Sequence, residues 1–386
     1  MKRIVAALLC FAVLGPAFAG AEEYYIYGVH DRYFTPFAPE FFGEDDAVYH
    51  AWGDRDGDIS LDWHLLWYRS GELFRDYAYP AAGGFSSSLF LPREDGTCGV
   101  LLPGQKDAET GGGCAVLYEW TADGLETEER IPGNWQKEDI KKADGGFFAY
   151  DGIAGVLSCF DSHGRPLREI SMAERIPQTV IMGKTCRGEI AGAVGDIDGL
   201  CAVVFRTETR SARHSRYLAV CMDRLEEKWS RSFQFDPALI LPGDGFIWRL
   251  ERTGSGAADP VKIIRLDAAG RDTIARTLSA DGLVLGVHMK VSPITGFLTI
   301  YGSAVSNARG VYTVFRMHLD RELKQVSLDV READFYEDYS PSVLMRGDGA
   351  LFVFCRGIEV TDPSAPAVLI PFGALPECGA NGIRIR

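Results

Sequence analysis

Asp144-Gly145-Gly146-Phe147-Phe148-Ala149-Tyr150 decides the fold, because an Asp-Gly turn signal here runs directly into a block of apolar residues. A turn signal followed by an apolar run occurs seven times in the 386-residue chain; the other six are Asp56-Gly57, Asp95-Gly96, Asp198-Gly199, Asp244-Gly245, Thr295-Gly296 and Asp348-Gly349. Their glycines follow one another at steps of 39, 49, 54, 46, 51 and 53 residues. A period of roughly 40–50 residues built from short strands is typical of a β-propeller.

A second polar turn follows within most repeats. Asp161-Ser162-His163-Gly164 and Asp267-Ala268-Ala269-Gly270 each separate two apolar strands. In the first repeat, Arg69-Ser70-Gly71-Glu72 is expected to join the second strand to the third. We therefore predict an all-β chain that forms a single β-propeller of seven four-stranded blades, with six or eight blades as alternatives. Residues 24–29 and 367–372 are the strand-like segments expected to close the ring.

The first residues have the pattern of a secretory signal. Lys2 and Arg3 precede an apolar stretch at residues 4–14, and Ala17-Phe18-Ala19 offers small residues for cleavage. We expect residues 1–21 to be a signal peptide and residues 22–386 to be the propeller domain. No later stretch approaches ~18 uncharged apolar residues, so we expect no transmembrane segment in the mature chain. The expected location is secreted, periplasmic or in the cell envelope.

The net charge of −14 limits the choice of partners. An acidic surface repels phosphate backbones, so we expect no nucleic-acid partner. Cations, basic partners and neutral glycans remain compatible with this charge. Protein and glycan ligands are therefore the partners to consider.

One repeat carries a candidate cation site. Gly53-Asp54-Arg55-Asp56-Gly57-Asp58-Ile59-Ser60-Leu61-Asp62 places carboxylates at Asp54, Asp56, Asp58 and Asp62. Alternate side chains of such a turn can converge on one centre, and Ca²⁺ takes six to eight hard oxygen ligands. The alternative is a solvated hairpin tip, because Asp is favoured in turns.

This stretch resembles the FG-GAP repeat of integrin α-type propellers, whose calcium loop lies between the first two strands of a blade. The resemblance covers about ten residues of one repeat. It implies that Asp54, Asp56, Asp58 and Asp62 bind Ca²⁺ as metal ligands. Ile59 stands where the family has glycine, and a β-branched residue is costly wherever the backbone needs a positive φ.

Cysteines and histidines supply further candidates. Cys201 and Cys221 lie on the second and third strands of one repeat, and a hairpin centred near Ser211 would let them form a cross-strand disulfide. Two buried free thiols are the alternative. His288 falls on an expected innermost strand and could face the central channel.

One loop, residues 206–216, is basic within this acidic chain and could bind a carboxylate or sulfate, or could simply be an exposed hairpin tip. No motif identifies a catalytic group. The expected function is an exported binding or scaffold module with a ligand on the face where loops converge, possible calcium stabilisation and no assigned catalytic residue. The alternative is an exported hydrolase or lyase that acts on glycan or peptide with carboxylates or His288 at the central funnel.

Overall fold

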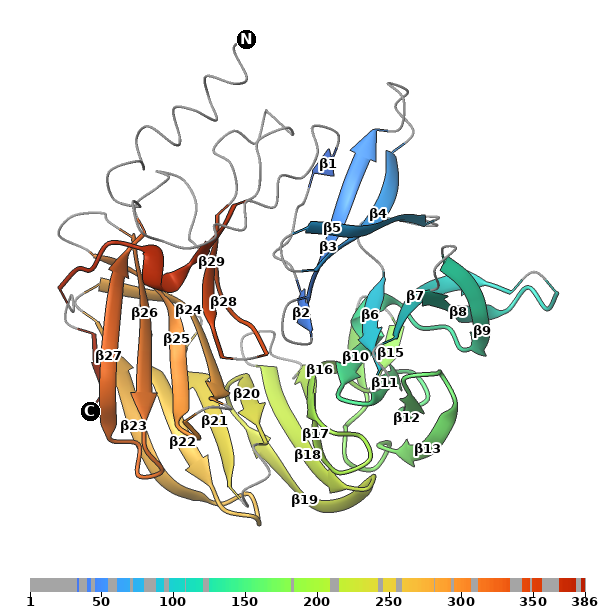
Figure 1. Cartoon of the computed structure of the whole chain (residues 1–386). Helices are drawn as coiled ribbons and strands as arrows, with labels where there is room; N and C mark the ends of the chain where they lie inside the picture. The colour runs from blue at the N-terminus through green and yellow to red at the C-terminus, as the bar shows by residue number, and fades with distance from the viewer. Residues whose placement is uncertain are drawn as a thin grey trace, which may run out of the picture. The chain divides into compact units, whose positions relative to one another are not determined.

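The computed structural model shows an all-β protein whose successive sheets are the blades of a seven-bladed β-propeller (Figure 1). It describes residues 33–34, 40–42, 46–54, 61–69, 72–79, 88–93, 97–107, 109–120, 125–181, 184–208, 215–241, 246–254, 259–280, 282–292, 295–306, 312–333, 342–347, 349–355, 368–379 and 383–385. The expected signal peptide and the strand expected at residues 24–29 lie outside this part of the chain.

Blades 1 to 4 come first along the chain. Blade 1 contains β1 (Tyr33–Phe34), β2 (Glu40–Phe42), β3 (Asp46–Asp54), β4 (Leu61–Arg69) and β5 (Glu72–Tyr79). Blade 2 contains β6 (Leu89–Pro92), β7 (Cys98–Lys106), β8 (Gly113–Trp120) and β9 (Leu125–Pro132). Blade 3 contains β10 (Ile140–Ala143), β11 (Gly146–Asp151), β12 (Val156–Asp161) and β13 (Pro166–Ser171). Blade 4 contains β16 (Glu189–Gly195), β17 (Leu200–Glu208), β18 (Ser215–Asp223) and β19 (Glu226–Phe233).

Blades 5 to 7 follow. Blade 5 contains β20 (Pro237–Ile240), β21 (Ile247–Arg252), β22 (Val261–Leu266), β23 (Asp272–Ser279) and the short β31 (Arg384–Ile385). Blade 6 contains β24 (Gly282–Val291), β25 (Leu298–Ser306), β26 (Tyr312–Leu319) and β27 (Gln325–Glu332). Blade 7 contains β28 (Ser342–Met345), β29 (Leu351–Cys355) and β30 (Val368–Pro371). β30 confirms a strand within residues 367–372, but among the described residues it pairs with β29 of its own blade, so the predicted closure of the ring stays a prediction.

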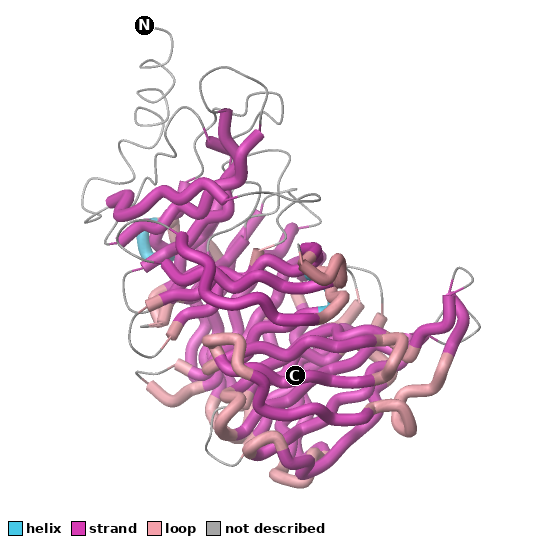
Figure 2. Tube along the Cα trace, turned by 90° about the vertical axis from the view of Figure 1, so that its right-hand side faces the viewer, coloured by secondary structure: helices cyan, strands magenta, loops and turns pink. Residues whose placement is uncertain are grey.

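Very little of the described chain is anything but strand or turn (Figure 2). A separate two-stranded ribbon, β14 (Thr179–Ile181) and β15 (Lys184–Cys186), stands between blades 3 and 4 in the sequence. The helical pieces of the described residues are the 3₁₀ turns η1 (Lys137–Asp139) and η2 (Phe372–Ala374). Among these residues, no helix has the length and apolar character needed to cross a bilayer.

The repeat deduced from the turn signals is confirmed in every blade. Each of the seven signals falls in the connection between the first and second long strands of a blade, as between β10 and β11 or β16 and β17. Arg69 ends β4 and Glu72 begins β5, so the short connection predicted in blade 1 is also confirmed.

Three of the turns between third and fourth strands share one geometry. Asp161, Asp267 and Asp320 each accept two backbone N–H bonds on Oδ1, from the residues two and four positions later. The residue three positions later has a positive φ in each turn: 78° at Gly164, 74° at Gly270 and 58° at Leu323. Aspartate suits this place because its short side chain satisfies the turn's own N–H groups.

The chain divides into two compact units, and apolar clusters join consecutive blades within each unit. One unit holds blades 2 to 5 and contains three such clusters. Leu117 and Phe147 belong to the cluster between blades 2 and 3, and Phe148 and Cys201 belong to the cluster between blades 3 and 4. The third cluster lies between blades 4 and 5. Successive side chains of a strand point to opposite faces, so one strand contributes to the cores on both sides of its blade. Phe147 and Phe148 show this alternation.

The other unit holds most of blade 1 together with blades 6 and 7. Leu66 and Tyr68 of blade 1 pack with Phe352 and Phe354 of blade 7 in one apolar cluster. The first and last blades of the chain are therefore neighbours, as the propeller prediction requires. Val314 of blade 6 and residues of β28 and β29 form the next cluster of this unit.

Candidate functional site

Ionisable side chains gather at one end of blades 3 and 4. We define the loop end of a blade as the end where its first strand begins and its second strand meets its third. The opposite end, which carries the Asp-Gly signals, is the turn end. Six residues from separate parts of the sequence lie at this loop end and form what we term the loop-end cluster: Asp139, Lys141, Glu189, Arg206, Tyr217 and Asp236.

Strand pairing brings two of these groups together. Glu189, the first residue of β16, is the register partner of Arg206 on β17, and Tyr217 on β18 is the next partner across the sheet. Paired residues of neighbouring antiparallel strands project from the same face. Arg206 Nη2 accordingly lies 2.7 Å from Glu189 Oε1, and both side chains remain partly exposed.

Two members of the cluster come from the start of blade 3, Asp139 and Lys141, and of these Lys141 interacts with Glu189. Burial lowers the pKa of Lys141, against the opposing effects of Glu138, Glu189 and Asp139. Burial raises the pKa of Asp139, although its carboxylate accepts the backbone N–H of Gln136 at 2.9 Å. Both groups are thus held away from their ordinary titration ranges, which is common at functional sites.

Tyr217 and Asp236 complete the loop-end cluster on the side of blade 4 that leads into blade 5. Burial raises the pKa of Tyr217, and the Asp236 carboxylate raises it further. The side chain of Asp236 reaches the surface, but the protein around it displaces enough water to raise the pKa of its carboxyl. The nearby Arg206 guanidinium lowers this pKa and partly offsets the effect. A charged or hydrogen-bonding ligand at this place would meet groups whose protonation it can change.

The backbone around Glu189 is fixed by the preceding arginine. The Arg187 N–H donates to Gly152 O at 2.6 Å, and its guanidinium donates to Ala173 O at 2.8 Å. Tyr150 donates its hydroxyl proton to Arg187 O at 2.6 Å. These bonds anchor the start of β16 to blade 3, so Glu189 is presented from a rigid element.

His288 is a second candidate, in blade 6. It lies on the first strand of that blade, as predicted, and its ring stacks on Tyr301 with centroids 5.7 Å apart. The pairing of β24 with β25 shifts between Val284 and Val287, which marks a β-bulge beside this residue. The His288 side chain reaches solvent, but the protein that surrounds its ring displaces water. This desolvation lowers the pKa of the imidazole.

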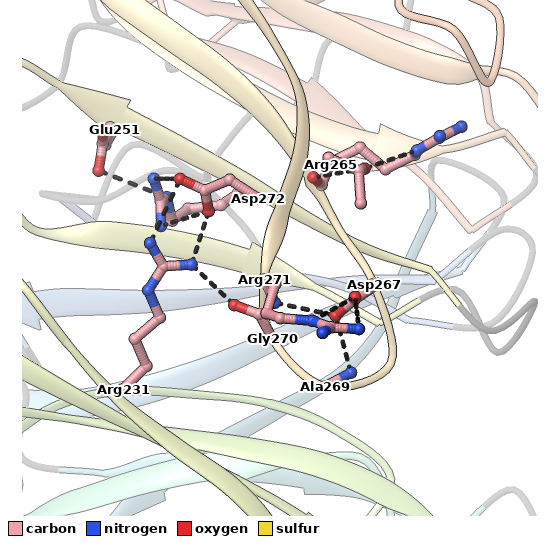
Figure 3. Close-up of polar contacts among 10 residues, drawn as sticks. Arg231, Glu251, Arg265, Asp267, Ala269, Gly270, Arg271 and Asp272 are labelled. Atoms are coloured by element: carbon pink, nitrogen blue, oxygen red, sulfur yellow. Dashed lines mark hydrogen bonds and ion pairs between the residues drawn. The ribbon is translucent and has the colours of Figure 1, made fainter.

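A denser ionic cluster, between blades 4 and 5, is structural (Figure 3). Arg249 on β21 is buried, and its guanidinium lies 3.4 Å from both Glu251 and Asp272. Arg231 on β19 binds Asp272 at 2.7 Å and donates to Gly270 O at 2.7 Å. Arg249 also covers the ring of Phe233 at 4.4 Å. These side chains join the two blades, and little of Arg249 is open to a ligand.

The predicted calcium ligands are only partly placed. Asp56 and Asp58 lie outside the described residues, and Asp54 and Asp62 are described in backbone alone. Gly53 pairs with Asp62 and Asp54 with Leu61, so the acidic stretch connects β3 to β4, the first two long strands of its blade. No group of three or more metal-binding side chains occurs elsewhere in the described part of the chain.

The predicted Cys201–Cys221 disulfide is wrong. Cys201 pairs with Met222, and Cys221 pairs with Ala202, so the two cysteines are one residue out of register. Because side chains alternate along a strand, Cys201 enters the core between blades 3 and 4, and Cys221 enters the core between blades 4 and 5. Both are buried free thiols, as are Cys114 and Cys159.

The basic loop at residues 206–216 is described at its two ends, and residues 209–214 lie outside the described part. Arg206 already pairs with Glu189, and Thr207 donates its hydroxyl proton to Arg216 O at 3.1 Å. The basic character of this loop identified Arg206 from the sequence, but no sequence pattern indicated the other five members of the loop-end cluster. No sequence spacing links them, because blade packing brings them together.

Comparisons with known proteins bear on the fold. No protein-family model matches the sequence, and no curated protein sequence matches it. The chain is similar in structure to prolyl oligopeptidase B from Galerina marginata bound to a 35mer hydrolysis and macrocyclization substrate, with a TM-score of 0.51 and 9% identity. That similarity covers 94% of this chain and 52% of the oligopeptidase, so the chain spans about half the length of that protein. It supports the fold alone.

Two other solved structures are more distantly similar. One is a neuraminidase-like protein of subtype N11 from a flat-faced bat isolate, with a TM-score of 0.40, 11% identity and coverage of 71% of this chain and 83% of that one. The other is an α-L-arabinofuranosidase from Fusarium graminearum in complex with an iminosugar inhibitor, with a TM-score of 0.37, 10% identity and coverage of 75% and 93%.

Proposed function

We propose that the protein is an exported β-propeller that binds a protein or glycan ligand through the loop-end cluster of blades 3 and 4. The observation that carries the proposal is the convergence of six ionisable side chains, four of them with shifted pKa values, at the loop end of two blades. Loops and strand ends held by a rigid scaffold are the usual place for recognition.

Ligand-induced stabilisation tests the proposal. Thermal midpoints are measured with N-acetyl-lysine amide, N-acetyl-arginine amide, acetate and maltotriose as separate probes. A probe present at about 100 times its Kd stabilises the folded protein by ~2.7 kcal/mol. At least one probe should raise the midpoint of the wild type and leave that of the Glu189→Gln/Arg206→Gln variant unchanged.

Glu226→Gln provides the matched control, because Glu226 is an exposed glutamate on β19 at the turn end of the same blade. It should keep the full response. If no probe shifts the wild-type midpoint, or if every shift persists in the double variant, the loop-end cluster is not a ligand site.

A hydrolase acting on glycan or peptide is the second candidate, and one observation favours it. Burial raises the pKa values of Asp139 and Asp236, and a raised pKa is the direction of change that a carboxyl acting as a general acid requires. Nitrophenyl glycosides and peptide anilides are suitable substrates for a turnover assay. Turnover that disappears in Asp139→Asn or Asp236→Asn would favour the enzyme, and an absence of turnover on both substrate classes would favour the binding module.

Calcium at the β3–β4 connection belongs to the same proposal. Support comes from the acidic sequence pattern and from its place between the first two long strands of a blade. With bound ions first stripped, Ca²⁺ should raise the thermal midpoint, and Asp56→Ala should abolish that rise. Identical melting curves with and without Ca²⁺ would reject the metal site.

Export is proposed from the first residues of the sequence. Expression in a secreting host, followed by N-terminal sequencing of the released protein, should give a chain that begins near Gly20 or Glu22. Recovery of the protein only inside cells, with Met1 retained, would contradict this part of the proposal.

A further inference from the structure

The described part of blade 7 is one strand short. β1 and β2 both pair with the edge of β3 that lies opposite β4, so together they form the first strand of blade 1 and complete its set of four. Blades 2 to 6 each contain at least four strands, whereas the described part of blade 7 contains β28, β29 and β30. Because four-stranded blades are the repeating unit of a propeller, one strand of blade 7 has still to be assigned.

The missing strand is the fourth, because β30 is buried in the manner of a third strand. Leu369 packs with Leu66 and Tyr68 of blade 1, and the adjacent Ile370 belongs to the apolar cluster that contains Val314 of blade 6. Both faces of β30 are therefore covered. The third strands β12 and β22 are mostly buried as well, whereas the fourth strands β13 and β19 are mostly exposed.

One edge of β30 is open within the described residues. β30 pairs with β29 on one side, and no described strand pairs with the other side. Such an edge presents a row of backbone N–H and C=O groups that a further strand can pair with. A fourth strand of blade 7 would lie along this edge.

The described residues after β30 are paired elsewhere. Glu377 is the bridge partner of Arg331 on β27, the fourth strand of blade 6. On the same edge of β27, the Glu332 N–H donates to Pro376 O at 2.9 Å. Further along the chain, β31 belongs to the sheet of blade 5. The chain therefore leaves blade 7 after β30, and its fourth strand must come from another segment.

The connections between blades indicate where that segment stands in the sequence. A fourth strand leads to the first strand of the next blade through a short connection, such as residues 133–139 after β9 and residues 234–236 after β19. Blade 1 is the neighbour of blade 7, and its first strand begins at Tyr33. The fourth strand of blade 7 should therefore end a few residues before Tyr33.

Residues 24–29, which lie outside the described part of the chain, occupy this place in the sequence. They read Tyr24-Tyr25-Ile26-Tyr27-Gly28-Val29, and three residues separate them from Tyr33. Aromatic and β-branched residues favour strands. We propose that residues 24–29 form the fourth strand of blade 7, antiparallel to β30, so that one blade is built from both ends of the chain and closes the ring.

Hydrogen exchange of backbone amides in the full-length protein tests this proposal. The N–H groups of Val368, Leu369 and Ile370 point alternately to β29 and to the other edge of β30. All three should exchange slowly in the wild type, because residues 24–29 cover that edge. The amides of residues 25–28 should be protected at alternate positions, since only those that face β30 are bonded.

Ile26→Pro and Tyr27→Pro form a matched pair of variants. Neighbouring residues of a strand point their N–H groups to opposite sides, and proline has no N–H. The variant that loses an N–H facing β30 should exchange about tenfold faster at the edge-facing amides of β30, and the other variant should exchange as the wild type does. Amides that face β29 should stay protected in both, which shows that blade 7 remains folded.

Four results would overturn the proposal. Rapid exchange of the edge-facing amides in the wild type would show that no strand covers β30. Equal acceleration in both proline variants would show that residues 24–29 do not pair as a strand. Exchange that is the same in the wild type and both variants would assign the edge to another segment. Protection that disappears on dilution of the wild type would assign it to a second copy of the protein.

Discussion

Replacing Gly270 by alanine tests how tightly the turns of one blade pack on the next. Gly270 has a φ of 74° in the turn between β22 and β23, and a Cβ there would lie 2.7 to 2.9 Å from three ring atoms of Trp229 on β19. The substitution should therefore raise the free energy of the folded state in two separate ways. One is the left-handed backbone conformation of a residue with a Cβ, and the other is displacement of the indole.

The magnitudes of these costs can be worked out separately. A left-handed conformation costs a non-glycine residue about 1–2 kcal/mol, and forcing an extra methyl into a packed site costs about 1–3 kcal/mol. Gly296 has a φ of 67°, and no atom of the described residues lies within 4 Å of the position of its Cβ, so Gly296→Ala carries the first cost without the second. We expect a loss of about 1–2 kcal/mol for Gly296→Ala and about 2–5 kcal/mol for Gly270→Ala.

Urea unfolding followed by tryptophan fluorescence gives both free energies of unfolding. The difference between the two variants measures the packing of the turn against Trp229, because the backbone cost is common to both. Equal losses would show that the indole does not occupy the space above Gly270, and the interblade packing described for blades 4 and 5 would then be incorrect.

Three further predictions concern ionisable side chains. Arg249→Met leaves the nearby Glu251 carboxylate without its cation and should lower the free energy of unfolding by about 3–5 kcal/mol. The double variant Arg249→Met/Glu251→Leu should recover most of this lost stability. A double variant no more stable than the single variant would refute the prediction. Burial raises the pKa of Cys201 to about 12 and that of Cys221 to about 11, so Ellman's reagent at about pH 8 should modify them only as fast as the protein unfolds; rapid reaction of the folded protein would contradict this. Burial lowers the pKa of His288 below 6.5, so the imidazole binds a proton more readily in the unfolded chain than in the folded protein. Stability should therefore fall as the pH drops through 6.5, and this fall should be smaller in His288→Gln. Identical pH profiles of the thermal midpoint in the two proteins would exclude this role of His288.

The sequence predicts the repeat well because the turns are local. Asp-Gly and Asp-x-x-Gly signals determine where a strand ends from a few neighbouring residues, and the apolar runs after them form the second strands. Leu323 departs from the pattern: it takes the positive φ that belongs to glycine in two sibling turns, yet its side chain is completely buried. Burial of a leucine contributes about 1.5–3 kcal/mol, which is enough to offset the backbone cost of about 1–2 kcal/mol.

Strand register and blade packing were harder to predict. The face on which a cysteine lies depends on the exact centre of its hairpin, and an error of one residue moved Cys201 and Cys221 to opposite sides of the sheet. Lys141, Glu189 and Asp236 are far apart in the sequence and share no spacing rule. Only the arrangement of blades 3 and 4 brings such groups together, so a single sequence carries no local signal for them.

The contact between the first and last blades has a consequence for how the chain folds. Leu66 and Tyr68 pack against Phe352 and Phe354, which lie about three quarters of the chain length later in the sequence. Contacts of such long range carry a high loop-closure entropy and form late. An apolar face of blade 1 therefore stays uncovered during synthesis until the final strands emerge, and it is the surface that a holdase chaperone would need to shield.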